Sequence, residues 1–383
     1  MMNDWLTARE ACERLGIRAQ TLYAYVSRGR IGAGPSPGEP HRSLYRAADV
    51  LALENRKRRG RKAAQVAADA IAWGEPVLQS SITTIAGGRL YYRGRDAVRL
   101  ANTETLESVA RLLRGGHGAA LKRSLRGPPP TGQTMRARAF TALAAKAGID
   151  PPARGRAPLA LAVEAATLLD VLTDAVCGVT AGGAVHERLG HAWGCGPAGC
   201  DLIRRALVLL ADHELNASTF AARVAASTGA SLSACALAGL ATLSGPLHGG
   251  AGARVKALSE EASRSGAAAA IEARLAQGAA LPGFGHPLYP EGDPRAAALL
   301  TVLRPSADLE ALRLAGSGAT GTPANVDFAL AAMADGLALP ADAPFALFAV
   351  ARCAGWIAHA LEQLQTGELI RPRARYVGAD PED

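Results

Sequence analysis

From about residue 77 onward, the chain is a succession of long apolar segments with helical spacing, separated by clusters of glycine and proline. Alanine, leucine and arginine dominate and favour helix, whereas strand signals are rare. The expected fold class is therefore all-α. Five segments carry the pattern: TLESVARLLRGG, MRARAFTALAAKAG, APLALAVEAATLLDVLTDAVCG, GCDLIRRALVLLADHEL and ASTFAARVAASTG.

One exception lies at the start of this region. LQSSITTIAGGRLYYRGRDAVRLA contains two short β-branched or aromatic stretches around a Gly–Gly pair, which is typical of a small hairpin. With 383 residues, the chain is long enough for two or three domains and a large core.

The basicity of the chain lies at its N-terminus. Of the net charge of +8, the part up to Lys62 carries thirteen Lys or Arg against six Asp or Glu, and the remainder twenty-nine against twenty-eight. This asymmetry predicts a small basic module with an anionic partner. We expect this module at residues 1–62, a basic, alanine-rich linker at 63–76 and a large helical domain at 77–383.

The N-terminal module begins with two predicted helices. In LTAREACERLG, Thr7 can cap, Glu10 follows three residues later, and Gly16 can end the helix in the left-handed conformation. IRAQTLYAYVSRGR predicts a second helix after a short turn, so the pair forms a helix-turn-helix. The exposed front of the second helix would present five residues to DNA: Arg18, Gln20, Thr21, Tyr23 and Ala24.

The rest of the module predicts a loop or wing at GAGPSPGEPHRS. One or two strand residues follow, then a helix capped near Ala48–Asp49. LTAREACERLGI, TLYAYVSRGRI and YRAADV resemble the winged helix-turn-helix of the MerR and excisionase type, which implies DNA binding. Two alternatives stay open: a protein–protein module that kept the fold, and a basic run that is only a solvated linker. That run is Arg56, Lys57, Arg58, Arg59, Arg61 and Lys62.

The longest uncharged stretch, Val224 to Ala253, predicts a buried helix rather than a membrane span, which needs about 20 strongly apolar residues. Small residues recur in it every four positions, which favours core packing or a subunit interface, with a two-fold dimer as the commonest case. They are Ala226, Ala230, Ala234, Ala238 and Thr242.

Cysteine usage and the N-terminal residues predict a reducing cytoplasm. The six cysteines show no disulfide framework, and MMNDWLTARE has no apolar signal core. Cys195 and Cys200, with His191 nearby, lack the common zinc spacings, so no metal is expected.

Three histidines stand at breaks between helical segments: His213 in LLADHELNAST, His248 in LSGPLHGGAGA and His286 in PGFGHPLYPEGDPR. Glycines let the backbone approach a ligand, and prolines hold a loop in one shape. A lone histidine there is more often structural, but three in succession predict a site.

Acids and arginines extend this set. Asp327 stands where a Gly/Thr/Pro loop meets an apolar helix, and Arg352 lies inside an apolar helix, where it should meet an anion. Arginines bind carboxylates, a carboxylate base can remove a proton next to a carbonyl, and neutral histidines can donate to carbonyl oxygens. Carbon–carbon bond formation between an enolised acyl donor and a keto acid fits every part.

Residues from about 77 to 378 resemble citrate synthase, through LYYRGRDA, LLADHELNAST, GPLHGGA, PGFGHPLYPEGDPRA, ANVDFALAAM, LFAVARCAGW and RPRARYVG in the family's order. The resemblance implies a two-domain helical fold behind the winged helix-turn-helix, with a small lid domain at about residues 250–340. It implies condensation of acetyl-CoA with oxaloacetate to citrate and CoA, with no further cofactor.

The resemblance also implies residue roles. His248 polarises the thioester carbonyl, Asp327 removes the methyl proton, and His286 polarises the ketone of oxaloacetate and protonates the new alkoxide. Three residues match oxaloacetate-binding positions: His213, Arg295 and Arg352. Arg371 matches the arginine contributed by the neighbouring subunit, which implies a homodimer.

Two departures concern the acyl-CoA. Pro287 stands where the family commonly has an arginine for the coenzyme phosphates, and Gly252 stands where asparagine is common. Two alternative functions stay open: a 2-methylcitrate synthase that uses propionyl-CoA, and a DNA-binding regulator whose synthase-like domain senses a metabolite.

Overall fold

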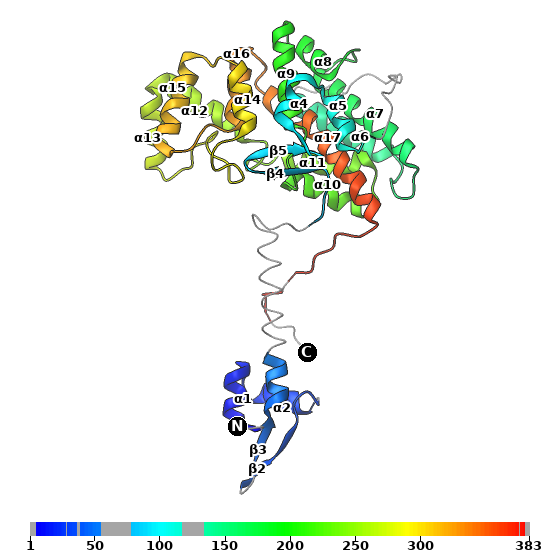
Figure 1. The fold of residues 1–383 in the computed structure, drawn as a ribbon, viewed down its shortest axis with the longest axis vertical. Helices are drawn as coiled ribbons and strands as arrows, with labels where there is room; N and C mark the ends of the chain where they lie inside the picture. The colour runs from blue at the N-terminus through cyan, green and yellow to red at the C-terminus, as the bar shows by residue number, and fades with distance from the viewer. Residues whose placement is uncertain are drawn as a thin grey trace. The chain divides into compact units, whose positions relative to one another are not determined.

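A computed structural model describes residues 5–27, 29–36, 39–54, 78–116, 134–374 and 376–379. The chain divides into two compact units, Met1–Gln79 and Ser80–Asp383 (Figure 1). The predicted basic run at 56–62 and the predicted linker at 63–76 lie outside the described residues. The domain boundaries at 62 and 77 stay predictions.

The N-terminal unit is a small winged helix-turn-helix. Its elements are β1 (Trp5–Thr7), α1 (Ala8–Leu15), α2 (Ala19–Ser27), β2 (Ala33–Ser36), β3 (Glu39–Arg46) and a helical segment at 47–54. The strands form an antiparallel sheet in the order β1-β3-β2. The Pro/Gly-rich stretch therefore contains β2 and the first half of β3, and β3 is longer than the one or two strand residues predicted.

Local capping explains where α1 begins and ends. The Thr7 N–H donates to Glu10 Oε2 at 2.8 Å, and the Glu10 N–H donates to Thr7 Oγ1 at 3.3 Å. Gly16 has φ of 58°, in the left-handed region. This confirms the predicted capping box and helix stop. The small core beneath is formed by Ala11, Leu15, Leu22, Ile31, Tyr45 and Val50.

The large unit is helical after one small sheet, which confirms the all-α prediction. The sheet contains β4 (Thr83–Ala86), β5 (Arg89–Tyr92) and β6 (Arg95–Asp96), with Gly87 and Gly88 at positive φ in the predicted hairpin turn. Among the described residues up to 243, its helices are α4 (Ala97–Thr103), α5 (Leu106–Leu113), α6 (Met135–Ile149), α7 (Pro158–Cys177), α8 (Val185–Ala192), α9 (Pro197–Leu210), α10 (Ala217–Ser227) and α11 (Leu232–Leu243).

The last helix, α17 (Ala343–Thr366), lies at the centre of this bundle and packs against α5, α6, α7, α9, α10 and α11 (Figure 1). Among the described residues it is the one helix long and apolar enough to cross a membrane. Its most apolar window is 89% buried within the protein, as expected for a core helix.

The uncharged stretch forms two helices rather than one, which corrects the prediction of a continuous ridge. α10 ends at Ser227, Gly229 takes a positive φ of 84°, and Ser231 caps α11. Ala226 therefore lies on α10, whereas Ala234 and its successors lie on α11. The two helices pack against each other as a hairpin.

A second group of helices lies to one side of the bundle (Figure 1). It contains α12 (Ala251–Ser265), α13 (Ala267–Ala276), α14 (Pro294–Val302), α15 (Ala307–Thr320) and α16 (Val326–Gly336). These helices pack mainly on one another, and α14 and α16 contact α9 and α17 of the bundle. A lid at about 250–340 stays a prediction.

Candidate active site

The three predicted histidines all lie in connections between helices. His213 lies between α9 and α10, His248 between α11 and α12, and His286 between α13 and α14. α9 ends at Leu210, so His213 lies in the connection after this helix, at a break between helices as predicted.

His213 and His286 meet at a shared tyrosine. The two imidazole rings are 5.2 Å apart, and His213 Nε2 lies 3.0 Å from the Tyr289 hydroxyl. Burial and the nearby Arg295 and Arg352 guanidinium groups hold the pKa of His213 well below its usual range. The His213 ring and the Tyr289 hydroxyl are therefore neutral hydrogen-bonding groups at pH 7.

The backbone holds the His286 loop against the start of α16. Gly285 donates to the Pro323 carbonyl at 2.9 Å, and Asn325 Nδ2 donates to the Gly285 carbonyl at 3.0 Å. The Leu288 N–H donates to His286 Nδ1 at 3.2 Å, which favours the tautomer protonated at Nε2. Burial, with Arg295, lowers the pKa of His286 to about 4, so its ring is neutral.

Arg295 is held by an acid two residues before it. Asp293 accepts from Arg295 Nε at 2.9 Å and from Arg295 Nη2 at 2.8 Å, and both side chains are buried. The same carboxylate accepts from the Val326 N–H at 3.0 Å. The cation is thereby fixed beside the first turn of α16, the turn that carries Asp327.

Asp327 is partly buried in that first turn, where its N–H is capped by Asn325. Burial raises the pKa of the Asp327 carboxyl to about 6, although Arg295, Arg254 and Arg352 oppose the shift. A carboxyl with a pKa near neutrality is suited to proton transfer at physiological pH.

His248 is coupled to the bundle through a serine. Its Nε2 lies 2.9 Å from Ser218 Oγ, and the Trp356 indole N–H donates to the same oxygen at 3.1 Å. Burial, with Arg352, lowers the pKa of His248 to about 4, so this ring is also neutral at pH 7.

Arg352 lies on α17 with 1% of its surface exposed. Its Nε donates to the Leu210 carbonyl at 2.9 Å and its guanidinium stacks on Phe348 at 4.8 Å, but Nη2 is buried without a partner among the described residues. Desolvation lowers its pKa to about 10, since the protein supplies too little compensating charge. The sequence predicted that Arg352 would meet an anion, and its buried Nη2 is the atom that could bind one.

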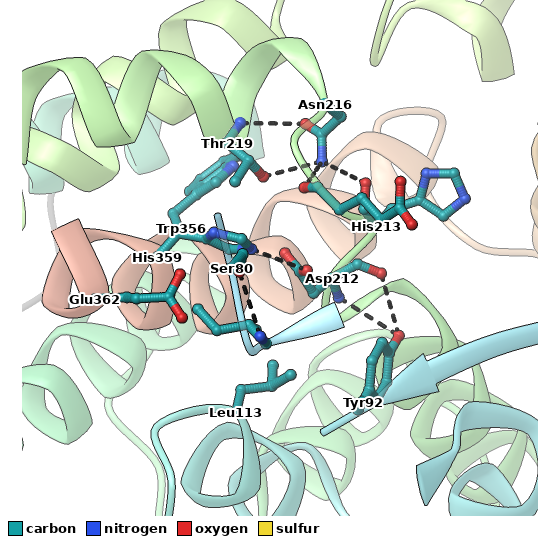
Figure 2. A network of polar contacts seen from close by, with 12 residues as sticks. Ser80, Tyr92, Leu113, Asp212, His213, Asn216, Thr219, Trp356, His359 and Glu362 are labelled. Atoms are coloured by element: carbon teal, nitrogen blue, oxygen red, sulfur yellow. Dashed lines mark hydrogen bonds and ion pairs between the residues drawn. The ribbon is translucent and has the colours of Figure 1, made fainter. Parts of the chain in front are cut away.

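A network of buried polar side chains lies next to His213 (Figure 2). Arg223 Nη1 donates to His359 Nδ1 at 3.1 Å, so His359 Nε2 carries the proton that it shares with Asp212 Oδ2 at 3.2 Å. The Tyr92 hydroxyl lies within 3.3 Å of the Asp212 carbonyl. Asp212, directly before His213, is thus held through both its carboxylate and its backbone carbonyl.

The structure does not bring every predicted residue to this place. Arg371 is exposed in the segment that follows α17. Gln20, Thr21 and Tyr23 are exposed on α2 of the N-terminal unit, and Arg18 is exposed directly before this helix, as predicted, whereas Ala24 is half-buried.

The described residues contain no cluster of His, Cys, Asp or Glu suited to a metal ion.

Four residues of the site were missed by sequence reasoning: Ser218, Tyr289, Asp293 and Asn325. Tyr289 and Asp293 lie in the same Pro/Gly-rich loop as His286, which was a usable signal. Ser218 and Asn325 are helix-capping residue types at helix starts, and their sequence context predicts a cap rather than a contact with the site.

Comparison with known proteins is consistent with this geometry. The model of the citrate synthase C-terminal domain matches residues 181–373, just over half of the chain, and a helix-turn-helix domain model matches residues 5–58. The putative citrate synthase 2 of Mycobacterium tuberculosis is 42% identical over 191 residues, which cover 45% of this chain and 50% of the relative. The chain thus spans about half the length of the curated relatives it matches.

Solved structures match over a longer part of the chain. The citrate synthase of Thermotoga maritima has a TM-score of 0.67 and 28% identity, over 81% of this chain and 96% of that one. The Thermoplasma acidophilum enzyme, solved in a ternary complex with carboxymethyl coenzyme A and oxaloacetate, has a TM-score of 0.68 and 25% identity, over 80% and 95% of the two chains. Together with the matched domain, these likenesses show that the chain belongs to the citrate synthase family.

Proposed function

We propose that the chain condenses acetyl-CoA with oxaloacetate and releases citrate and CoA. The observation that carries the proposal is Asp327, a carboxyl with a pKa near 6 that lies within the electrostatic influence of Arg295 and Arg352. Two histidines that are neutral at pH 7 belong to the same site. A base, two neutral donors and two buried cations match the needs of an enolisation followed by attack on a keto acid.

In the first step, the Asp327 carboxylate removes a proton from the methyl group of the thioester, and His248 donates a hydrogen bond to the thioester oxygen. Ser218 has one hydroxyl proton and two acceptors in reach, His248 Nε2 at 2.9 Å and Asn216 Oδ1 at 2.7 Å. In the structure the Ser218 hydroxyl donates to Asn216 Oδ1. For His248 to donate from Nδ1, this hydroxyl must instead turn and donate its hydrogen bond to His248 Nε2.

In the second step, the enol carbon attacks the ketone of oxaloacetate, and His286 donates from Nε2 and then protonates the alkoxide. The Leu288 N–H at Nδ1 keeps His286 in the required tautomer. Water then cleaves the citryl thioester, which yields citrate and CoA.

The oxaloacetate carboxylates would be held by Arg352, whose Nη2 is buried without a described partner, and by Arg295. Asp293 occupies Nε and Nη2 of Arg295, which leaves Nη1 for the substrate. His213 adds a neutral donor. We further propose a homodimer in which Arg371 reaches the site of the other subunit, since Arg371 is exposed beyond α17.

Thiol release tests the proposed activity. Purified protein, oxaloacetate and either acetyl-CoA or propionyl-CoA are mixed with a thiol reagent, and the Asp327→Ala variant serves as the control. We expect release that depends on oxaloacetate and is lost in Asp327→Ala. Equal release by both proteins would contradict the role of Asp327, and faster release with propionyl-CoA would favour 2-methylcitrate synthesis.

We also propose that the N-terminal unit binds DNA. The proposed location is a reducing cytoplasm, which is consistent with six free cysteines. The support is the exposed face of α2 with Gln20, Thr21 and Tyr23, the exposed Arg18 directly before it, and the basic charge of residues 1–62. Gel shifts of the full chain should weaken steeply with salt, and deletion of residues 1–62 should abolish them. If the truncated chain binds equally well, the unit is not a DNA-binding module.

A metabolite-sensing regulator makes a different prediction for the same samples. Oxaloacetate or acetyl-CoA would then change the gel shift in the absence of turnover. Retention of Asp327, His248 and His286 favours the enzyme, because a sensor does not need a base.

A further inference from the structure

A cavity of about 300 Å³ lies between α5, α7, α8 and α17. None of the seven proposed catalytic and substrate-binding residues lines it. α17 contributes Ala354 and Ile357 to its wall, whereas Arg352 and His359 are seven residues apart and lie on the other side of that helix. The cavity is therefore distinct from the candidate active site.

Three of the charged groups that line the cavity come from α5 and its C-cap. Glu107, Arg111 and Arg114 follow a spacing of four and three residues, which places them on the same side of the helix. Arg114 Nε and Glu107 Oε2 are buried without a hydrogen-bond partner among the described residues. The cavity thus holds an unpaired donor on a cation and an unpaired acceptor on an anion.

The two arginines also lack a counter-ion. Across the described residues, the structure gives neither Arg111 nor Arg114 a side-chain hydrogen bond or an ion pair. Burial and the neighbouring charge of Arg111 lower the pKa of Arg114. The negative end of the α5 dipole stabilises a cation at this position, but it provides no partner for a buried Nε.

The acids around the cavity are already occupied. Asp170 accepts from Arg188 Nη1 at 2.7 Å, and Asp174 pairs with Arg188 Nη2. Glu107 Oε1 accepts from the Val185 N–H at 2.7 Å, which leaves only Oε2 open. Among the described residues, no acid in this wall forms an ion pair with Arg111 or Arg114.

We propose that this cavity binds a small organic phosphate that carries hydroxyl groups, with the phosphate at Arg111 and Arg114 and a hydroxyl donating to Glu107. Guanidinium groups match phosphate oxygens with two parallel hydrogen bonds. A cavity of this size suits a sugar phosphate. Gly182 and Gly183, at the rim, lack side chains and let a ligand approach their backbone.

Calorimetry on the full chain tests this proposal with three probes: ribose 5-phosphate, inorganic phosphate and ribose. We expect ribose 5-phosphate to bind more tightly than phosphate, and ribose not to bind. Arg114→Gln should weaken both phosphates by tenfold or more, because it removes the cation. Arg264→Gln, at an exposed arginine of α12, is the matched control and should leave both affinities unchanged.

Glu107→Gln separates a sugar phosphate from a bare anion. The glutamine can keep an oxygen toward Val185, but it presents an NH₂ donor where Oε2 had accepted. It should weaken ribose 5-phosphate about tenfold and leave phosphate within about twofold. Equal binding of phosphate and ribose 5-phosphate, with no response to Glu107→Gln, would overturn the role of the hydroxyl.

No binding of ribose 5-phosphate to the wild-type chain at millimolar concentration would overturn the whole proposal. Arg111→Gln repeats the test at the other arginine if Arg114→Gln lowers the unfolding temperature. All readouts are binding affinities, so their outcome is independent of whether the chain proves to be a citrate synthase.

Discussion

The two units of the chain place their functional side chains in opposite environments. At the start of α2, the side chains of Arg18, Gln20, Thr21 and Tyr23 are exposed, as contacts with a large polyanion require. In the large unit, Arg295 and Arg352 are 2% and 1% exposed. Burial raises the pKa of Asp327 to about 6 and lowers the pKa values of His248 and His286 to about 4. Side chains that contact a partner at the surface need only be exposed in the right place. Side chains that transfer protons at neutral pH must be buried, because burial shifts their pKa values.

The largest expected effect is on turnover. Asp327→Asn keeps the shape of the side chain but removes the base, so thiol release should fall by about 10² to 10⁴-fold. Gel shifts of the same variant should match those of the wild type, since α2 is untouched. A variant that keeps more than about a tenth of the activity would show that Asp327 is not the base.

The next largest effect is on stability. Asp293→Ala removes the partner of the fully buried Arg295 and should lower the free energy of unfolding of the large unit by about 3–5 kcal/mol. Denaturant titration measures it. Asp335→Ala, at an exposed aspartate of α16, is the control and should cost less than about 0.5 kcal/mol. Equal effects would mean that the Asp293–Arg295 pair does not stabilise the fold.

The pH dependence of stability follows from Asp327. Its folded pKa, about 6, exceeds the ordinary unfolded value of about 3.9, so the folded state binds the extra proton. The free energy of unfolding should therefore fall as the pH rises from about 4 to about 6, and stay lower above that. Asp327→Asn abolishes this loss and should gain up to about 3 kcal/mol at pH 8.

Turnover should move the other way over the same range, rising as Asp327 ionises, with a midpoint near pH 6. Denaturant titrations and thiol release at matched pH values measure both trends. Stability of Asp327→Asn that is no higher than wild type at pH 8 would contradict the raised pKa.

The smallest expected effect is on stability, and it has opposite signs for alanine substitutions at two glycines. Gly16→Ala forces a side chain into φ of 58° with no atom nearby to clash, so it should destabilise α1 by about 1 kcal/mol. Gly148→Ala, inside helix α6 with open space around it, should stabilise the large unit by a similar amount. Hydrogen exchange resolved by segment measures both, and the same sign at both positions would contradict the backbone explanation.

Local rules predicted much of the fold. The Thr7–Glu10 capping box, the Gly87–Gly88 hairpin and most helices of the large unit depend on residues a few positions apart. The ridge from Ala226 to Thr242 failed for the same reason: regular spacing alone could not show that Gly229 breaks the helix. Short-range patterns identify elements, but small irregularities decide their ends.

The sequence by itself determined the helical class, the basic helix-turn-helix module and the candidate residues. The reason is that hydrophobic periodicity, charge and histidines flanked by glycine or proline are all visible in short segments of the chain. The tertiary structure decided which partners those residues meet. Asp293 pairs with Arg295, and Ser218 contacts both His248 and Trp356. Arg352 Nη2 has no hydrogen-bond partner in the part of the chain that the structure describes. Burial and pairing depend on chain segments far apart in sequence, and a pKa depends on all the groups around it.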